Sequence, residues 1–355
     1  MKPKIDIVVV AFLGELKLLR LQARSLRLYA DPDLINNIYI LVHDRHPEIF
    51  LWRFLRTVLP EYGALASKVI FVDTRILFGV PVPRDGWWGQ QAAKLLAANV
   101  VSTDCYLVLD CKNHLIRPLN HENIFDQNGR MKMPMVAVHE PYRERYSAAY
   151  EFFGVATNDA SAKTLPTITP FLFKTAFVTE LIQCVEKKES CAFYDFFMRK
   201  VCTEFYLYIA FLAASDRPIE SSYAQCEAIR ATFFEEAVHN ESIQRQIQKI
   251  VQNEKVYSFG VHRRAAAIAT PEFIDVVSQI WQQFYLSSSL KESKYFLAPD
   301  EILASGWLTR LKRRILRIAN IDFGGRPTKR ASEFWSILAN AAVIPPKRLW
   351  TLLNK

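Results

Sequence analysis

The sequence predicts an α/β fold in which helices cover both faces of a mostly parallel β-sheet. Four short, almost continuous apolar runs fall within the first 110 residues, and the segments between them carry apolar residues at helical spacing. Strands without polar alternation are typical of parallel sheets that are buried on both faces. Acidic residues follow the runs directly, as at His43-Asp44, Asp73 and Asp110. We therefore expect a doubly wound domain with a ligand site outside the carboxyl ends of its strands.

The first 110 residues are expected to alternate regularly between strand and helix. The predicted strands are 5–13, 37–42, 68–72 and 105–109, and the predicted helices are 15–29, 47–59 and 87–101. Pro47 suits the first turn of its helix, because its missing N–H is not needed there. A loop containing proline, 79–86, precedes the third helix.

The middle of the chain is less regular, and it ends in a polar break. We expect strands at 135–139 and 255–261, an apolar stretch at 167–173, and helices at 174–187, 193–212 and 271–285. The break at 287–294 divides the chain into an α/β body, 1–286, and a helical segment, 287–355. Only 11 glycines and no visible repeat argue against solenoids and propellers.

The net positive charge of the chain comes entirely from its last 52 residues. Residues 304–355 hold eleven basic and two acidic residues, which equals the whole net charge of +9, so residues 1–303 are neutral. This excludes a nucleic-acid binder that is basic throughout, and we expect no nucleic-acid partner. The stretch 306–320 can form a basic amphipathic helix with Trp307 near one end, which suits an anionic membrane surface. The alternative is a C-terminal helix that packs on the body with a solvated basic face.

Composition also bears on the cellular location. The first apolar run is too short to span a bilayer, which needs about 20 apolar residues, and it lacks the cleavage site of a signal peptide. The six cysteines form no CxxC pair, as expected for reduced thiols. We expect a cytoplasmic protein, peripheral on the inner face of the plasma membrane if its basic segment binds lipid.

Polar residues gather around the predicted ends of the strands. Gln91 and Lys94 lie three residues apart, so they share one face of the third helix, and this face can turn toward Asp110. A carboxylate just beyond a buried strand suits a sugar hydroxyl, a ribose or a hard cation on a diphosphate. For Asp44 and Asp73 the other interpretation is that they only terminate strands and cap helices.

Two sequence blocks resemble a known family. The helix Gly86-Trp-Trp-Gly-Gln-Gln-Ala-Ala-Lys-Leu95, the apolar strand ending at Asp110 and the later Arg117-Pro118 form the first block, and 203–208 (TEFYLY) forms the second. Over residues 4–265 the chain resembles bacterial GT-A-type glycosyltransferase-like proteins, which are largely of unassigned function. The resemblance implies that a nucleotide-sugar donor lies across the strand ends, with Asp73, Gln91, Lys94 and Asn113 near it and an acidic triplet against its diphosphate.

The triplet departs from the family pattern. In place of Asp-x-Asp, the chain has Asp110-Cys111-Lys112, so an ammonium replaces one carboxylate. Lys112 would neutralise the leaving diphosphate directly and weaken or remove the need for Mn²⁺ or Mg²⁺. The resemblance makes His262 the residue that completes a metal site with Asp110, whereas His262 with Arg263 would bind phosphate without a metal. A lone histidine is more often structural.

The resemblance predicts an enzyme that transfers a hexose from a nucleotide sugar to a cell-envelope or extracellular glycan. This acceptor glycan is either free or linked to a lipid. Glu204 is the candidate that takes the proton of the acceptor hydroxyl or contacts the acceptor, together with Asp110 and Lys112 as catalytic residues. The alternative is that Glu204 only caps a helix after Thr203. The aromatic stretch 193–211 would form an acceptor platform or, more simply, core. The alternative function is a degenerate domain that binds a glycan or a partner protein at the membrane without turnover.

Overall fold

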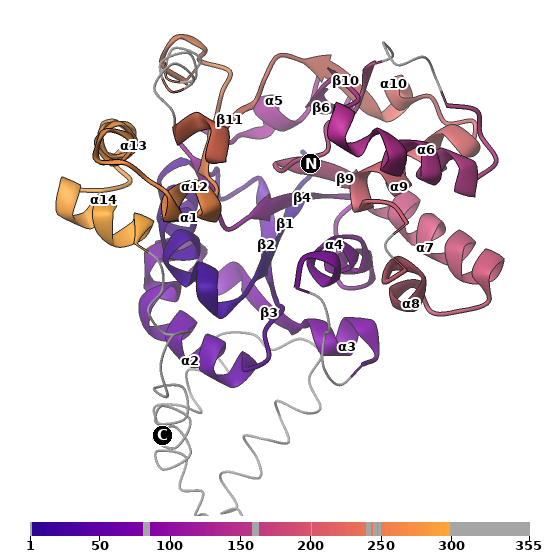
Figure 1. Cartoon of the computed structure of the whole chain (residues 1–355), viewed down its shortest axis with the longest axis horizontal. Helices are drawn as coiled ribbons and strands as arrows, with labels where there is room; N and C mark the ends of the chain where they lie inside the picture. The colour runs from indigo at the N-terminus through magenta and orange to yellow at the C-terminus, as the bar shows by residue number, and fades with distance from the viewer. Residues whose placement is uncertain are drawn as a thin grey trace, which may run out of the picture.

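A computed structural model of the chain describes residues 2–80, 86–157, 163–199, 201–238, 243, 247 and 250–298. Its centre is a five-stranded sheet in the order β3-β2-β1-β4-β9 (Figure 1). The first four strands in this order are parallel, and only β9 runs antiparallel, against β4. The predicted α/β fold with a mostly parallel sheet is therefore confirmed. The bounds of its strands are β1 (Ile5–Ala11), β2 (Ile35–Val42), β3 (Val69–Asp73), β4 (Cys105–Asp110) and β9 (Phe171–Lys174).

β1 occupies the centre of the sheet, and all seven of its residues are buried. It pairs with β2 on one side and with β4 on the other, where Val10 lies opposite Asp110. The one charged residue in this strand, Asp6, accepts hydrogen bonds from the backbone N–H groups of Asn37 and Ser102, at 2.9 and 2.7 Å. These bonds compensate the carboxylate for its lost hydration. Because the four strands are parallel, their carboxyl ends meet at one edge.

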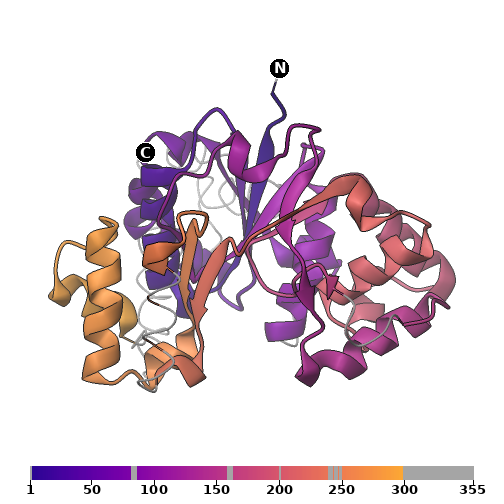
Figure 2. The same cartoon turned by 90° about the horizontal axis from the view of Figure 1, so that it is seen from above.

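Helices cover both faces of this sheet, as Figure 2 shows. The helices α1 and α2 lie on one side together with the 3₁₀ segment η2, and α4, α7 and α9 lie on the other. Helix α1 buries an apolar stripe that includes Leu19, Ala23 and Leu26. The bounds are α1 (Leu16–Tyr29), α2 (Pro47–Thr57), η2 (Leu59–Lys68), α4 (Gly86–Leu96), α7 (Thr175–Glu189) and α9 (Glu204–Ala214).

A second, smaller core forms beside α1. The strands β11 (Arg230–Phe233), β12 (Ser258–Val261) and β5 (Asn113–Leu115) make a three-stranded sheet, and α13 (Pro271–Gln283) covers it with the fully buried Trp281. The last described helix, α14 (Leu290–Leu297), joins this core through Phe296. Arg24 of α1 connects the two cores, because its guanidinium pairs with Glu61 of η2 at 3.0 Å and with Glu292 of α14 at 2.8 Å.

Three predicted elements differ from the structure. The predicted helix 193–212 is two helices, α8 (Phe193–Phe197) and α9, because the Thr203 hydroxyl accepts a backbone hydrogen bond and starts a new helix. The polar break at 287–294 contains the start of α14, which Ser289 caps in the same way. The predicted strand 135–139 shrinks to the two residues of β7, paired with β8. The boundary at residue 286 stays a prediction, because 299–355, including the basic segment, lies outside the described residues.

The remaining described elements are mostly short, and among them β10 pairs with β6 and β7 with β8 in two further two-stranded sheets. They are η1 (Leu13–Glu15), α3 (Thr74–Phe78), η3 (Ala97–Asn99), α5 (His121–Ile124), β6 (Met131–Pro134), β7 (Val136–Ala137), η4 (Glu140–Tyr142), α6 (Arg143–Phe152), β8 (Lys163–Thr164), α10 (Ile219–Ser222), β10 (Tyr223–Cys226), η5 (Glu235–Val238) and α12 (Arg263–Ala267). Within the described part of the chain, no helix is both long enough and apolar enough to cross a bilayer. All six cysteines are free thiols.

His114 of β5 gives the second core a measurable pH dependence. Its imidazole is fully buried and packs edge-on against Trp281, with ring centroids 5.6 Å apart. Burial lowers the pKa of His114 to about 3. The folded protein therefore keeps this ring neutral at pH values where the unfolded chain protonates it.

We predict that the free energy of unfolding is highest above pH 6.5 and falls as the pH drops toward 3, because only the unfolded state gains a proton on His114 over this range. The loss from this one group amounts to roughly 2 kcal/mol by about pH 5. Urea unfolding at about pH 7.5 and pH 5 measures it. His114→Gln should reduce the difference between the two pH values, whereas His139→Gln, on the surface, should leave it unchanged. Equal pH dependence in His114→Gln and the parent protein would contradict the prediction.

Candidate functional site

Asp110 ends β4 at the carboxyl edge of the central sheet, and both oxygens of its carboxylate are engaged. Lys94 Nζ lies 3.0 Å from Oδ1, and Lys112 Nζ contacts Oδ2. The Thr169 hydroxyl also donates to Oδ2, at 2.8 Å. One carboxylate is thus held between two ammonium groups and a hydroxyl.

Lys94 belongs to two ion pairs at once. It extends from α4 toward the sheet, and its Nζ lies 3.2 Å from Glu204 Oε1 at the first position of α9. The side chains of Lys94 and Glu204 are only 9% and 4% exposed. The ring of Phe205 lies 5.4 Å from the same ammonium, in a cation–π contact. The predicted proximity of Lys94 to Asp110 is therefore what the structure shows, and Glu204 joins them across 110 residues of sequence.

The four charged groups balance one another. Burial alone would raise the pKa of Asp110, but Lys112 and Lys94 outweigh burial and hold it well below its usual range. Burial likewise opposes the charge on Lys94, but Asp110 and Glu204 raise the pKa of this ammonium. Glu204 differs, because burial raises its pKa and Lys94 compensates only in part. Lys94 is therefore the fixed counter-charge of the cluster, and Glu204 is its most easily protonated member.

The turn after β4 is held by buried amides. Asn113 Oδ1 accepts a hydrogen bond from the backbone N–H of Asp110 at 2.7 Å. Gln22 Nε2 of α1 donates to the carbonyl oxygens of both Asp110 and Asn113, at 2.6 and 3.0 Å. Asn113, which the resemblance places near the donor, is buried, and so is the next residue, His114. The reason is that β5 pairs with β12 directly after the turn and carries these side chains into the protein.

His262 and Arg263 come to the same edge from the second sheet. His262 precedes α12 at the end of β12, and burial together with the positive charge of Lys112 lowers its pKa to about 4. The Arg263 guanidinium packs over the ring of Phe12, which follows β1, with 5.4 Å between them. Glu15 completes the group: burial raises the pKa of Glu15, and the nearby cations Lys112 and Arg263 oppose that rise.

Other predicted residues lie apart from this cluster or face away from it. Asp73 caps α3 and pairs with its neighbour Arg75, and Asp44 accepts backbone hydrogen bonds from Leu13 and His46, both at 2.8 Å. Asp73 thus has the capping role that we considered as the alternative, whereas Asp44 connects the loop after β2 to the exit from β1. A contact of Asp73 with a donor stays a prediction. Gln91 is 2% exposed, and its amide has no hydrogen-bond partner among the described residues.

The aromatic stretch belongs to the core. Phe193, Phe196, Phe205 and Tyr208 are almost completely buried. The interpretation of this stretch as core is thus confirmed for these side chains, since a stacking platform for a sugar needs an exposed ring face.

The residues present do not fit a divalent metal ion shared by Asp110 and His262. A metal bound to Asp110 would have to displace an ammonium group from either oxygen. His262 Nδ1 lies 3.7 Å from Glu235. Within the described ranges, no group of three or more His, Cys, Asp and Glu side chains is arranged to hold a metal.

Sequence reasoning missed Thr169, Glu15 and Gln22. Thr169 reaches Asp110 across 59 residues, and Gln22 reaches its carbonyl across 88. Neither residue lies in a motif, so nothing in the sequence marks them. Glu15 does carry a signal, since it follows the first apolar run as Asp110 follows the fourth.

Comparison with known proteins places the chain in a family. Residues 4–286 match the family described as "Family of unknown function (DUF6492)". No curated protein sequence matches significantly. Similar solved structures include galactosyltransferase LgtC in complex with donor and acceptor sugar analogs, at 14% identity, with 79% of this chain and 100% of that chain covered and a TM-score of 0.42. Mouse xyloside xylosyltransferase 1 follows at 10% identity, 72% and 97% coverage and the same TM-score. The glycosyltransferase GlyE of Streptococcus pneumoniae TIGR4 has 13% identity, 83% and 62% coverage and a TM-score of 0.39.

The shared ammonium of Lys94 predicts strong coupling between Lys94 and Glu204. Lys94→Met should destabilise the fold by about 3–5 kcal/mol, because it leaves a buried carboxylate without its partner. Glu204→Gln should cost less, since Lys94 keeps Asp110. In the double variant the loss should be smaller than the sum of the two single losses.

A double-mutant cycle measured by urea unfolding tests this coupling. The matched control is the surface pair of Lys255 and Glu227, which are 66% and 59% exposed. That pair should give a coupling below about 1 kcal/mol. A coupling of the same size in both pairs would show that the buried position of Lys94 has no special effect.

Proposed function

We propose that this chain, which belongs to the family of unknown function DUF6492, is a glycosyltransferase that binds a nucleotide-sugar donor at the carboxyl edge of its central sheet. The main observation that supports this proposal is the pair of ammonium groups that contact Asp110. The resemblance of the two sequence blocks to GT-A-type proteins supports the same reaction. The donor sugar would be a hexose, and the acceptor a cell-envelope or extracellular glycan, free or lipid-linked.

Lys112 is the proposed ligand of the donor diphosphate. Its ammonium pairs with one oxygen of Asp110, while Lys94 neutralises the other. Lys112 can therefore turn to a phosphate oxygen without leaving Asp110 unpaired. Arg263 is a second cation at this edge, and its guanidinium has no ion pair with any described carboxylate. Two cations placed beside a leaving diphosphate stabilise the negative charge that develops as the glycosidic bond breaks.

Glu204 acts through Lys94 in this proposal. Its side chain is 4% exposed and faces the ammonium, so it holds Lys94 against Asp110 instead of meeting an acceptor. A base role for Glu204 would require the acceptor hydroxyl to reach a nearly closed position. Glu204 is therefore proposed as a positioning residue.

The same burial favours a second candidate function. A domain that binds a glycan or a partner protein, but that lacks a base reachable by an acceptor, would bind its ligand without turnover. Glycan binding with no transfer to any acceptor distinguishes this candidate from the enzyme. The binding role of Lys112 and Arg263 is common to both.

The basic segment 304–355 is proposed to hold the protein at an anionic membrane surface, which would place it on the inner face of the plasma membrane in the cytoplasm. Support comes from its charge of +9 and from the amphipathic stretch 306–320.

We predict that Lys112→Ala weakens the binding of UDP- or GDP-sugars by about 10- to 100-fold, the range expected for one hydrogen bond to a charged group. Isothermal titration with a panel of nucleotide sugars measures the affinity, and donor hydrolysis measures turnover. EDTA should leave both unchanged. Lys291→Ala, which removes an exposed lysine from α14, is the matched control. If no nucleotide sugar binds the parent protein, the proposed donor site is wrong.

We also predict that deletion of residues 304–355 abolishes sedimentation with vesicles that contain anionic phospholipid. The parent protein should bind such vesicles less well as salt increases, because charges at a surface are screened. Donor binding in the truncated chain serves as the control for folding. Unchanged vesicle binding after truncation would assign the segment to packing on the body.

A further inference from the structure

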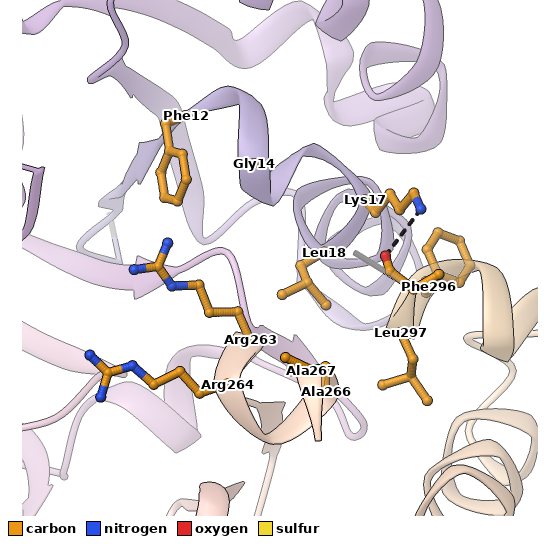
Figure 3. Close-up of a pocket in the computed structure, with 11 residues that line it drawn as sticks. Phe12, Gly14, Lys17, Leu18, Arg263, Arg264, Ala266, Ala267, Phe296 and Leu297 are labelled. Carbon is orange, nitrogen blue, oxygen red and sulfur yellow. Dashed lines mark hydrogen bonds between the residues drawn. The ribbon is translucent and has the colours of Figure 1, made fainter. Parts of the chain in front are cut away.

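A cavity of about 340 Å³ lies between helices α1, α12 and α14, next to the proposed donor site (Figure 3). Phe12 and Gly14 line it at the exit from β1, and Leu18 lines it from α1. This volume lies within the range of small-molecule sites. Because three separate helices line the cavity, it is a feature of the tertiary structure and not of one loop.

The middle of the cavity is apolar and its two ends are cationic. Leu18, Ala266, Ala267 and Leu297 face one another across the middle. At one end Lys17 Nζ donates to the carbonyl oxygen of Ala298 at 3.0 Å, which ties α1 to the end of α14.

At the opposite end, Arg263 and Arg264 extend from α12 side by side, away from the apolar middle (Figure 3). Arg263 stacks on Phe12 and has no ion pair with any acid in the described ranges. Arg264 is 71% exposed and makes one long contact with Glu235, at 3.5 Å. None of the residues that line the cavity is acidic. Arg263 has the Glu15 carboxylate in its vicinity without an ion pair, and Arg264 pairs only at 3.5 Å, so both guanidinium groups keep N–H donors that can bind an anion.

We infer that the cavity binds an amphiphile with a phosphate head group, whose apolar chain enters between α1, α12 and α14 while the phosphate meets Arg264, the guanidinium that the proposed donor site does not use. The alternation of apolar and cationic surface matches this chemistry, because a chain removed from water gains free energy along its whole length. The segment 304–355 is a poor occupant, since its own charge of +9 would face two arginines.

Two sources could supply such a ligand. A single-chain isoprenoid phosphate is the chemistry of a lipid-linked acceptor, and a two-chain phosphatidic acid is the chemistry of a membrane. The inference concerns the phosphate and the apolar chain that they share. It does not depend on sugar transfer, because it is tested by binding alone.

Isothermal titration of the full chain with farnesyl phosphate tests the inference. Farnesol lacks the phosphate and inorganic phosphate lacks the chain, so each should bind at least about tenfold more weakly. Dihexanoyl phosphatidic acid is titrated in parallel below its micellar concentration. Tighter binding of farnesyl phosphate would indicate a lipid-linked acceptor as the ligand, and tighter binding of the phosphatidic acid would indicate a membrane lipid.

Ala267→Trp should fill the cavity and weaken farnesyl phosphate binding by at least about tenfold, and Arg264→Gln should weaken it through the head group. Ala267 is exposed, so the variant is expected to fold, and thermal unfolding checks this. Ala214→Trp, at an exposed alanine in α9, is the matched control and should bind as the parent does.

Three outcomes would overturn the inference. The first is inorganic phosphate binding as tightly as farnesyl phosphate. The second is unchanged farnesyl phosphate binding in Ala267→Trp. The third is loss of nucleotide-sugar binding in Ala267→Trp while farnesyl phosphate still binds, which would assign the cavity to the donor instead.

Discussion

The site depends on one electrostatic arrangement, the carboxylate of Asp110 held between the ammonium groups of Lys94 and Lys112. A carboxylate at the end of a buried strand loses much of its hydration, and it stays ionised only when nearby cations replace that hydration. Lys94 supplies this charge from the interior, and Glu204 compensates Lys94 in turn. The cluster therefore joins β4, α4 and α9 into one unit. Lys112 is the more exposed of the two ammonium groups bound to Asp110.

The parallel sheet explains why these groups meet. Strands that run in the same direction end at the same edge, so Asp110 of β4 lies beside the exit from β1. The second sheet then brings its own strand end to this edge, because β12 pairs with β5 directly after the Asp110 turn. His262 and Arg263 follow β12 and consequently lie near Lys112 and Phe12. Two separate cores thus contribute to one charged edge.

The balance of charge differs between three parts of the chain. The cluster at Asp110 is balanced, with two lysines against two carboxylates. The cavity beside it is lined by two arginines and by no acid. The segment 304–355 carries the whole net charge of the protein. A body of zero net charge can therefore hold locally strong positive sites without being drawn to anionic polymers in general.

Periodicity and motif spacing in the sequence were enough to predict the parallel sheet, the order of its first four strands along the chain and the approach of Lys94 to Asp110. Periodicity and spacing were sufficient because these features depend on short segments, namely apolar runs, helical repeats and the triplet that begins at Asp110. Only the tertiary structure decided which polar residues are buried. Asn113 and Glu204 are candidate residues and His114 follows Asn113 in sequence, yet all three side chains are buried because β5 and α9 pack there. Thr169, the cavity and the stacking of Arg263 on Phe12 join segments that are far apart in sequence, and packing between distant segments leaves no local pattern that a sequence could display.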